Sequence, residues 1–491
     1  MKLYLIGHDY KYAVEQIMLT LFPQERPEYP GGKPRGDRME LRLSEGKRYV
    51  TAACKLSLGD KTYYGRAAAA LEKLDGPLLR DRICQRLIKN AVYKAALASG
   101  IKRPPWGALT GVRPGKLFVP LLDEGMSGNE AVREFMERYD VSEERARLCL
   151  ATSGETIKAR DSLGEKDLCL YVGIPFCPTR CAYCSFVSQS VEKSMKLIEP
   201  FLEALYLELE AVAQQVDELG LRIISVYFGG GTPTTLSASQ LDELCSFLER
   251  RFDLSRVREY TVEAGRPDTI TGEKLAVLRR HGVDRISVNP QTMSDRVLNV
   301  IGRKHTAQDI VNALEKVRAA GGFAVNMDLI AGLPADDEEG FAGTLDKVLA
   351  LAPENITVHT LSLKKGSRIS LEGSEIPDGA AVSAMLDTAF EKLSGAGYAP
   401  YYLYRQKFMS GGFENVGWAK GEHINLYNIC IMEELCSILA AGGGGSTKLI
   451  RPDEGRNIRL MAPKYPLEYI KGIEKTCREK QEIGKFYRQE E

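Results

Sequence analysis

The chain of 491 residues is long enough for two or three domains, and its 44% hydrophobic and 27% charged residues are ordinary values for a globular protein. Its 66 basic and 66 acidic side chains balance, which argues against a strongly basic nucleic-acid-binding protein. The N-terminus resembles neither a signal nor a transit peptide, and no apolar run approaches the roughly 18 residues of a membrane span. We therefore expect a cytoplasmic protein with reduced thiols, no membrane span and no nucleic-acid partner.

The first 165 residues predict a separate α+β domain that leads through helices into the next domain. Apolar periodicity and turn residues mark its segments. In chain order these are a strand at 2–7, a helix at 12–22, a hairpin at 39–56, a segment rich in proline and glycine at 103–116, and helices at about 128–158.

From residue 167 onward, short apolar β-prone runs alternate with helix-length amphipathic stretches. The runs lie at 167–172, 223–228, 259–263, 285–288, 324–330 and 355–363. Six such units predict a parallel sheet with right-handed crossovers, as in a partial (βα)6 TIM-like barrel; a doubly wound open sheet is the alternative. We expect this core at 166–400 and a C-terminal capping region at 401–491, which holds a glycine run and a charged helical tail.

A glycine-rich or polar segment follows each of the six runs. The segments are CPTRCAYC at 177–184, GGGTPT at 229–234, EAGRPD at 263–268, NPQTM at 289–293, AGLPAD at 331–336 and SLKKGS at 362–367. Ligands of α/β barrels and open α/β sheets bind where the strands end, so these loops should converge on one site.

The most specific motif is C-x3-C-x2-C, formed by Cys177, Cys181 and Cys184. Structural zinc and most 4Fe–4S clusters take four ligands, so a site with three thiolates leaves one position for another molecule. Clustered thiolates suit an iron–sulfur cluster. Two alternatives are unrelated buried thiols and a zinc site that a distant histidine completes.

With an aromatic residue before its third cysteine, this motif resembles that of the radical SAM superfamily. Five further segments resemble the oxygen-independent coproporphyrinogen III dehydrogenase (oxidase) family: 171-YVGIPFC, 229-GGGTPT, 287-SVNPQT, 302-GRKHT and 326-NMDLIAGLP. Two others, 111-GVRPGKL and 264-AGRPDTIT, resemble its HemZ-type branch, which carries an additional N-terminal domain. The resemblance covers about residues 165–450.

The resemblance implies two cofactors, a 4Fe–4S cluster on the three cysteines and S-adenosylmethionine on the open iron. It places Tyr171 and Tyr183 beside the bound S-adenosylmethionine, and Ser362, on the sixth strand, is a weaker assignment. By the same resemblance, the remaining cofactor contacts are Gly230, Gly231 and Thr232 at its amino group, Glu263 at a polar group, Gln291 and Asp328 at its sugar, and Arg303 near its carboxylate. The alternative roles are helix or turn capping for Glu263, Gln291 and Asp328, and a solvated helix end for Arg303.

The implied reaction is oxidative decarboxylation of two propionates of coproporphyrinogen III to vinyl groups, by a 5′-deoxyadenosyl radical. Two departures leave other functions open. Phe186 stands where well-studied dehydrogenases carry a further cysteine, and 423-HINLYN keeps only His423 and Tyr427 of the chaperone branch's HNxxYW motif. The alternatives are a heme chaperone, another radical SAM reaction on a tetrapyrrole such as anaerobic heme ring opening, and an RNA-modifying enzyme, which the charge balance disfavours.

The implied partners are a tetrapyrrole and a reducing electron donor of the flavodoxin or ferredoxin type. A substrate with four carboxylates needs fixed cations, and arginine binds carboxylates in a bidentate manner. The candidate cations are Lys364, Lys365, Arg368 and Arg266, although a solvated charge run is an equal alternative. Most of the eight cysteines outside the motif lie in apolar periodic surroundings, which predicts that they are core residues. Because none pairs at metal-ligand spacing, we do not expect a second cluster.

Overall fold

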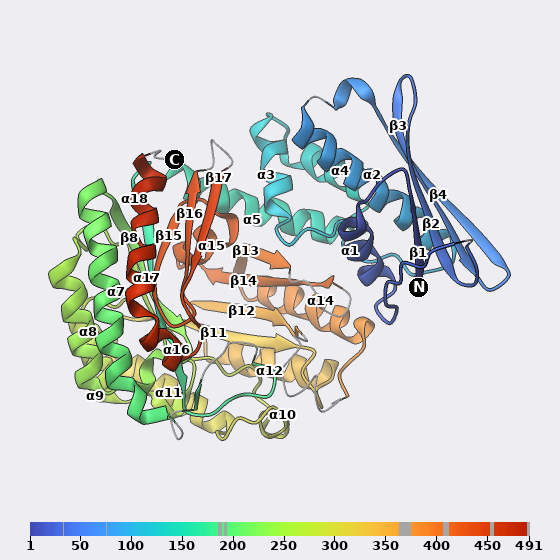
Figure 1. Ribbon diagram of the computed structural model, residues 1–491. Helices are drawn as coiled ribbons and strands as arrows, with labels where there is room; N and C mark the ends of the chain where they lie inside the picture. The colour runs from blue at the N-terminus through green and yellow to red at the C-terminus, as the bar shows by residue number, and fades with distance from the viewer. Residues whose placement is uncertain are drawn as a thin grey trace. The chain divides into compact units, whose positions relative to one another are not determined.

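The computed structural model describes residues 1–32, 34–74, 76–184, 189–190, 194–362, 375–405, 412–451 and 456–488. The chain forms two compact units (Figure 1). The first comprises 1–150 and 405–414, and the second comprises 151–404 and 415–491. The boundaries expected from the sequence, after residues 165 and 400, stay a prediction.

The first unit is built on a four-stranded sheet, in which β1 (Lys2–Ile6) lies parallel to β2 (Arg38–Glu45) and the other pairs are antiparallel. Alternate residues of β3 (Tyr49–Leu58) point into the core. The predicted 2–7 strand, 12–22 helix and 39–56 hairpin are present, as β1, α1 (Lys11–Leu21) and the β2–β3 pair, whereas β4 (Lys61–Ala70) was not predicted. Helix α2 (Pro77–Ala98) packs so closely on β4 that a Cβ on Gly65 would lie 2.0 Å from the Ala91 carbonyl oxygen.

The remaining helices of this unit are α3 (Gly115–Asp123), α4 (Gly128–Tyr139) and the start of α5 (Glu143–Asp161). A buried polar cluster binds Arg405 and Glu414 into the unit. Trp106 Nε1 donates to the Glu414 carboxylate at 2.6 Å, and Arg145 pairs with the same carboxylate at 2.6 Å. The Arg405 guanidinium donates to the Leu109 carbonyl and lies over the Trp106 ring.

The core of the second unit is a run of six parallel strands at the positions predicted from the sequence. They are β5 (Asp167–Ile174), β8 (Arg222–Gly230), β9 (Glu259–Glu263), β10 (Arg285–Ser287), β11 (Ala324–Ala331) and β12 (Asn355–Thr360). Neighbours in the sheet are also neighbours in chain order. A doubly wound sheet would reverse its strand order part-way, so the predicted partial barrel is confirmed over the open-sheet alternative.

Amphipathic helices connect the strands and cover the outer face of the curved sheet (Figure 1). They are α7 (Ile198–Leu219), α8 (Ala238–Arg251), α9 (Gly272–Arg280), α10 (Asp295–Val300), α11 (Ala307–Ala320), α12 (Glu338–Ala350) and α14 (Gly379–Gly395). Local sequence sets their starts: Ser237 with Gln240 and Thr306 with Asp309 form capping boxes for α8 and α11.

The C-terminal region extends the sheet at both edges. At one edge β14 (Glu414–Lys420) pairs antiparallel with β12, and β13 (Tyr398–Arg405) lies beyond it. At the other edge β15 (Ser437–Gly442) pairs parallel with β5, followed by β16 (Ser446–Arg451) and β17 (Arg456–Met461). The helices are α15 (Leu426–Glu433), α16 (Pro466–Lys471), α17 (Ile473–Glu479) and α18 (Gln481–Arg488). Among the described residues, no helix has the length and apolar character to cross a membrane.

A buried ion pair joins the C-terminal helices to the barrel. Lys480 Nζ lies 2.8 Å from the Glu208 carboxylate, and the two side chains are 4% and 0% exposed. The same carboxylate accepts hydrogen bonds from the Tyr469 hydroxyl at 2.5 Å and the Gly442 N–H at 2.7 Å. Helix α7, the end of β15 and the C-terminal helices therefore meet at one charged centre.

Replacing Lys480 by methionine is expected to lower the free energy of unfolding by about 3–5 kcal/mol, because it leaves the Glu208 carboxylate buried without its cation. The double variant Glu208→Gln/Lys480→Met should recover most of the loss. The matched control is Lys475→Met, whose side chain is 78% exposed and which should cost less than about 1 kcal/mol. Urea denaturation gives the free energy of unfolding of all three variants. An equal decrease in Lys480→Met and Lys475→Met would contradict the prediction.

Candidate active site

The cysteine loop follows β5 and is hydrogen-bonded to the glycine-rich end of β8. The Gly231 N–H donates to the Ile174 carbonyl at 2.8 Å, and the Thr232 N–H donates to the Phe176 carbonyl at 2.7 Å. The Thr232 hydroxyl lies 3.5 Å from the Cys177 sulfur and donates to it. The structure thus brings together the two motifs that the sequence separates by about fifty residues, and both lie at the C-terminal end of the strands.

Glycine is required in this loop because the backbone segments approach one another closely. A Cβ on Gly231 would lie 2.5 Å from the Phe176 carbonyl oxygen and 2.8 Å from that of Ile174. Gly230 has a φ of 103°, which disfavours any residue with a side chain. The surface beside Cys177 is therefore bare backbone, to which a small ligand can come close.

Two buried arginines lie against the cysteine loop. Arg266 Nη1 donates to the Thr179 hydroxyl at 2.8 Å and lies 4.0 Å from the Cys181 sulfur. Arg303 donates to the Tyr183 hydroxyl at 3.0 Å and to the Asn289 carbonyl at 2.7 Å. Burial alone would raise the pKa of the Cys181 thiol, but Arg303 and Arg266 outweigh it and lower that pKa. The thiolate form, which is the metal ligand, is therefore favoured.

His305, from the 302–306 segment, is a site residue that sequence reasoning left without a role. It is 7% exposed, and neither ring nitrogen has a hydrogen-bond partner among the described residues. Burial and the neighbouring Arg303 and Arg266 lower its pKa to about 4, so the ring is neutral at pH 7. A signal in the sequence was its position two residues after Arg303.

Three tyrosines, from β5, β8 and α15, stack on one another beside Glu263. The Tyr227 ring stacks on Tyr427 with centroids 4.3 Å apart and on Tyr171 at 6.1 Å. The Tyr227 hydroxyl donates to the Glu263 carboxylate at 2.6 Å. Burial raises the pKa of Glu263 to about 7, with the charge of Asp328 adding to it. Glu263 is therefore half-ionised near neutral pH.

Gln291 and Asp328 are brought together by the backbone. Gln291 has a φ of 67°, and its N–H donates to the Asp328 carbonyl at 2.9 Å. A left-handed conformation is uncommon for glutamine and clusters at functional sites. Burial opposes ionisation of Asp328, but the nearby His359 ring, 3.8 Å away, and a hydrogen bond from the Asn326 amide at 2.8 Å outweigh it and lower its pKa, so the carboxylate is charged.

Four predicted residues are not among the described ones, and two others, Ser362 and His423, are. Lys364, Lys365, Arg368 and Phe186 lie outside the described residues. Ser362 is described, and its hydroxyl is buried without a hydrogen-bond partner in the described part of the chain. His423 borders a cavity of about 680 Å³ together with Glu259, Arg285 and Ala324, the residues at which β9, β10 and β11 begin. It therefore lies at the opposite end of the strands from Cys177.

Residues 171–348 match the Radical SAM superfamily. Over 97% of the chain, the sequence is 35% identical to the oxygen-independent coproporphyrinogen-III oxidase-like protein HemZ of Bacillus subtilis, of which the match covers 96%. The chain belongs to the family of this HemZ protein. The heme chaperone HemW of Haemophilus influenzae is 26% identical over 62% of this chain and 76% of its own length.

A solved structure shares the fold of this family member. It is the coproporphyrinogen III oxidase HemN from Escherichia coli, a radical SAM enzyme. The TM-score is 0.52 with 22% identity, over 66% of this chain and 73% of that one. The described residues fit the cofactors of the superfamily: three cysteines on one loop, two cations that favour thiolate at Cys181, and bare backbone beside Cys177.

Proposed function

We propose that this protein is an enzyme that converts coproporphyrinogen III to protoporphyrinogen IX without oxygen. The observation that carries the proposal is the 35% identity to HemZ over nearly the whole chain, together with the cysteine loop bonded to the glycine-rich strand end. When bound, the cluster and S-adenosylmethionine would supply radical chemistry, the removal of a hydrogen atom from the β-carbon of a propionate. Loss of CO2 from that propionate, with one electron passed to an external one-electron acceptor, would then leave a vinyl group.

The protein side chains hold and shield the reacting groups in this proposal. Cys177, Cys181 and Cys184 would hold the 4Fe–4S cluster, and three protein ligands would leave one position for S-adenosylmethionine. The cofactor contacts are Tyr171, Tyr183, Gly230, Gly231, Thr232, Glu263, Gln291, Arg303 and Asp328. Because Arg266 is 3% exposed and contacts Thr179, we assign it to the cysteine loop in preference to a substrate propionate.

The substrate is a tetrapyrrole, and the reaction needs an external reductant of the flavodoxin or ferredoxin type. We place the enzyme in the cytoplasm, where such a reductant and reduced thiols occur together. The partial barrel suits radical chemistry, since a site at the mouth of a barrel keeps water away from a reactive intermediate.

The proposal is tested by anaerobic turnover with the reconstituted protein, S-adenosylmethionine, a strong reductant and coproporphyrinogen III. Deoxyadenosine and a product lighter by two formic-acid equivalents are expected. Deoxyadenosine with an unchanged porphyrinogen would point to another tetrapyrrole, and heme is the first to try. An intact cluster without any cleavage of S-adenosylmethionine would contradict an enzymatic role.

A heme chaperone is the second candidate, which the similarity to HemW favours. His423 borders the 680 Å³ cavity, and Tyr427 stacks within the barrel. Spectroscopic titration with heme distinguishes the two functions. Binding of one heme per chain, lost in His423→Ala, with no decarboxylation, would favour the chaperone; turnover without stoichiometric heme binding would favour the enzyme.

The pKa of Glu263 near 7 predicts a pH-dependent affinity for S-adenosylmethionine. The cofactor is a cation at its sulfonium, so it binds the ionised carboxylate better and shifts the pKa downward. The ionised fraction rises about tenfold from pH 6 to pH 8, and affinity should follow it. Dividing by the affinity of Glu263→Gln at each pH removes the cofactor's own titration. A ratio that stays constant from pH 6 to pH 8 would contradict this role.

A further inference from the structure

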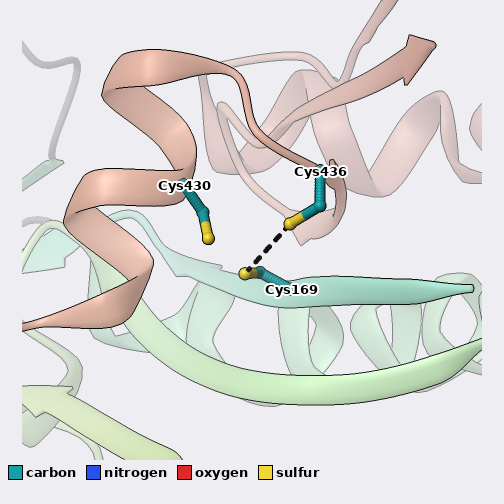
Figure 2. A group of neighbouring side chains, drawn as sticks. All are labelled: Cys169, Cys430 and Cys436. Carbon is teal, nitrogen blue, oxygen red and sulfur yellow. Dashed lines mark hydrogen bonds between the residues drawn. The ribbon is translucent and has the colours of Figure 1, made fainter. Parts of the chain in front are cut away.

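Three cysteines outside the motif converge at a single point in the second unit. Cys169 lies on β5, Cys430 on α15, and Cys436 directly before β15 (Figure 2). Their sulfur atoms all lie within 4.8 Å of one another, and those of Cys169 and Cys436 are 3.9 Å apart. The spacing in the sequence concealed this group, because Cys169 and Cys436 are 267 residues apart.

The local backbone explains the convergence. Helix α15 ends at Glu433, the capping residue Glu434 adopts a φ of 54°, and the Leu435 N–H donates to the Cys430 carbonyl at 3.2 Å. This reversal returns Cys436 to the side of Cys430. Ile438 is paired with Cys169 in the sheet, and Cys436 lies in the bend directly before β15, with its sulfur 3.9 Å from that of Cys169.

We propose that Cys169, Cys430 and Cys436 form a binding site for one thiophilic d10 metal ion. Three sulfurs bound to one ion at about 2.3 Å lie about 4 Å apart in a trigonal arrangement, close to the spacing of these three atoms. All three thiols are buried, and their shell is apolar, with Ile224, Tyr427 and Ile438 among its members. Thiolate ligands select soft ions, and Cu(I) and Zn(II) are the d10 ions that they bind in proteins.

The number of ligands favours Cu(I) over Zn(II). The described residues supply three histidine, cysteine or carboxylate ligands to this group, whereas structural zinc takes four. The bound ion would fasten α15 and the start of β15 to the first barrel strand. It would thereby hold Tyr427, three residues before Cys430, against Tyr227. The site is separate from the Cys177 loop, since Cys169 precedes the end of β5 by five residues.

The test uses the full-length chain with Cys177, Cys181 and Cys184 replaced by alanine, so that bound metal cannot be on the motif. Under anaerobic conditions it is titrated with Cu(I) against a chromophoric chelator, and separately with Zn(II). One equivalent of either ion is expected, with affinity at least about 100-fold lower after Cys430→Ser or Cys436→Ser. The matched control is Cys245→Ser, another buried cysteine, which should keep the ion.

A second measurement covers the case in which the variant without the three motif cysteines does not fold. The wild-type chain is first reconstituted with iron and sulfide, so that the Cys177, Cys181 and Cys184 motif is occupied, and is then loaded with the metal. X-ray absorption at the copper or zinc edge should show three sulfur ligands at about 2.3 Å, and the signal should disappear in Cys436→Ser. The two edges distinguish the ions. Failure of both ions to bind, or binding that persists in Cys430→Ser and Cys436→Ser, would overturn the proposal.

Discussion

Replacing Cys181 by alanine is expected to abolish both the iron–sulfur cluster and turnover. Cys181 is the motif cysteine beside two buried arginines, and those arginines favour its thiolate form. Without it the loop offers two thiolates to a cluster that needs three protein ligands in this superfamily. The measurements are iron and sulfide content after reconstitution, and deoxyadenosine formation, which should fall below detection.

The control for this variant is Cys245→Ala. Cys245 is also buried, on α8, and the Tyr260 hydroxyl donates to its sulfur at 3.5 Å. Its loss should lower stability modestly, by removing buried side-chain volume, while the iron content stays at the wild-type level. A Cys181→Ala protein that retains a full cluster and wild-type turnover would show that another residue supplies the ligand.

Replacing Gly231 by alanine is the second change with a large expected effect. The added Cβ would lie 2.5 Å from a backbone carbonyl oxygen, which cannot rotate away as a side chain would. Overpacking typically costs about 1–3 kcal/mol, and here the strain falls on the hydrogen bonds that join the β8 end to the cysteine loop. We expect the affinity for S-adenosylmethionine to fall at least about tenfold.

Gly343→Ala is the matched control. Gly343 lies in α12, and a Cβ there would meet no atom within 4 Å. Alanine favours a helix by about 1 kcal/mol over glycine, so this variant should be as stable as the wild type or more so, with unchanged affinity. Equilibrium dialysis of the cofactor and thermal melting compare the two; equal affinities would mean that the Gly231 backbone is not part of the cofactor site.

The barrel core was predictable because its signals are local. β-Prone apolar runs identified all six strands. The cysteine motif was equally recognisable, since its three cysteines lie within eight residues. The hairpin at 39–56 was predicted, but β4 was not, because it is polar and half exposed and depends on α2 packing against Gly65.

Features that depend on tertiary packing were not predictable. Glutamine has no preference for positive φ, so the conformation of Gln291 follows from its pairing with β11 and not from local sequence. The two arginines at Cys181 come from different loops, and only the fold brings them together. Cys169, Cys430 and Cys436 were expected to be core residues, and they are buried. Their sulfur atoms lie close together because β15 pairs with β5.

The most direct test of the proposed reaction is an isotope measurement. Coproporphyrinogen III deuterated at the β-carbons of its propionates is incubated anaerobically with the reconstituted protein, S-adenosylmethionine and a reductant, and the deoxyadenosine is analysed by mass spectrometry. We predict one deuterium in the deoxyadenosine for each vinyl group formed. Deoxyadenosine without deuterium, alongside unchanged substrate, would contradict hydrogen abstraction from the propionates of this substrate.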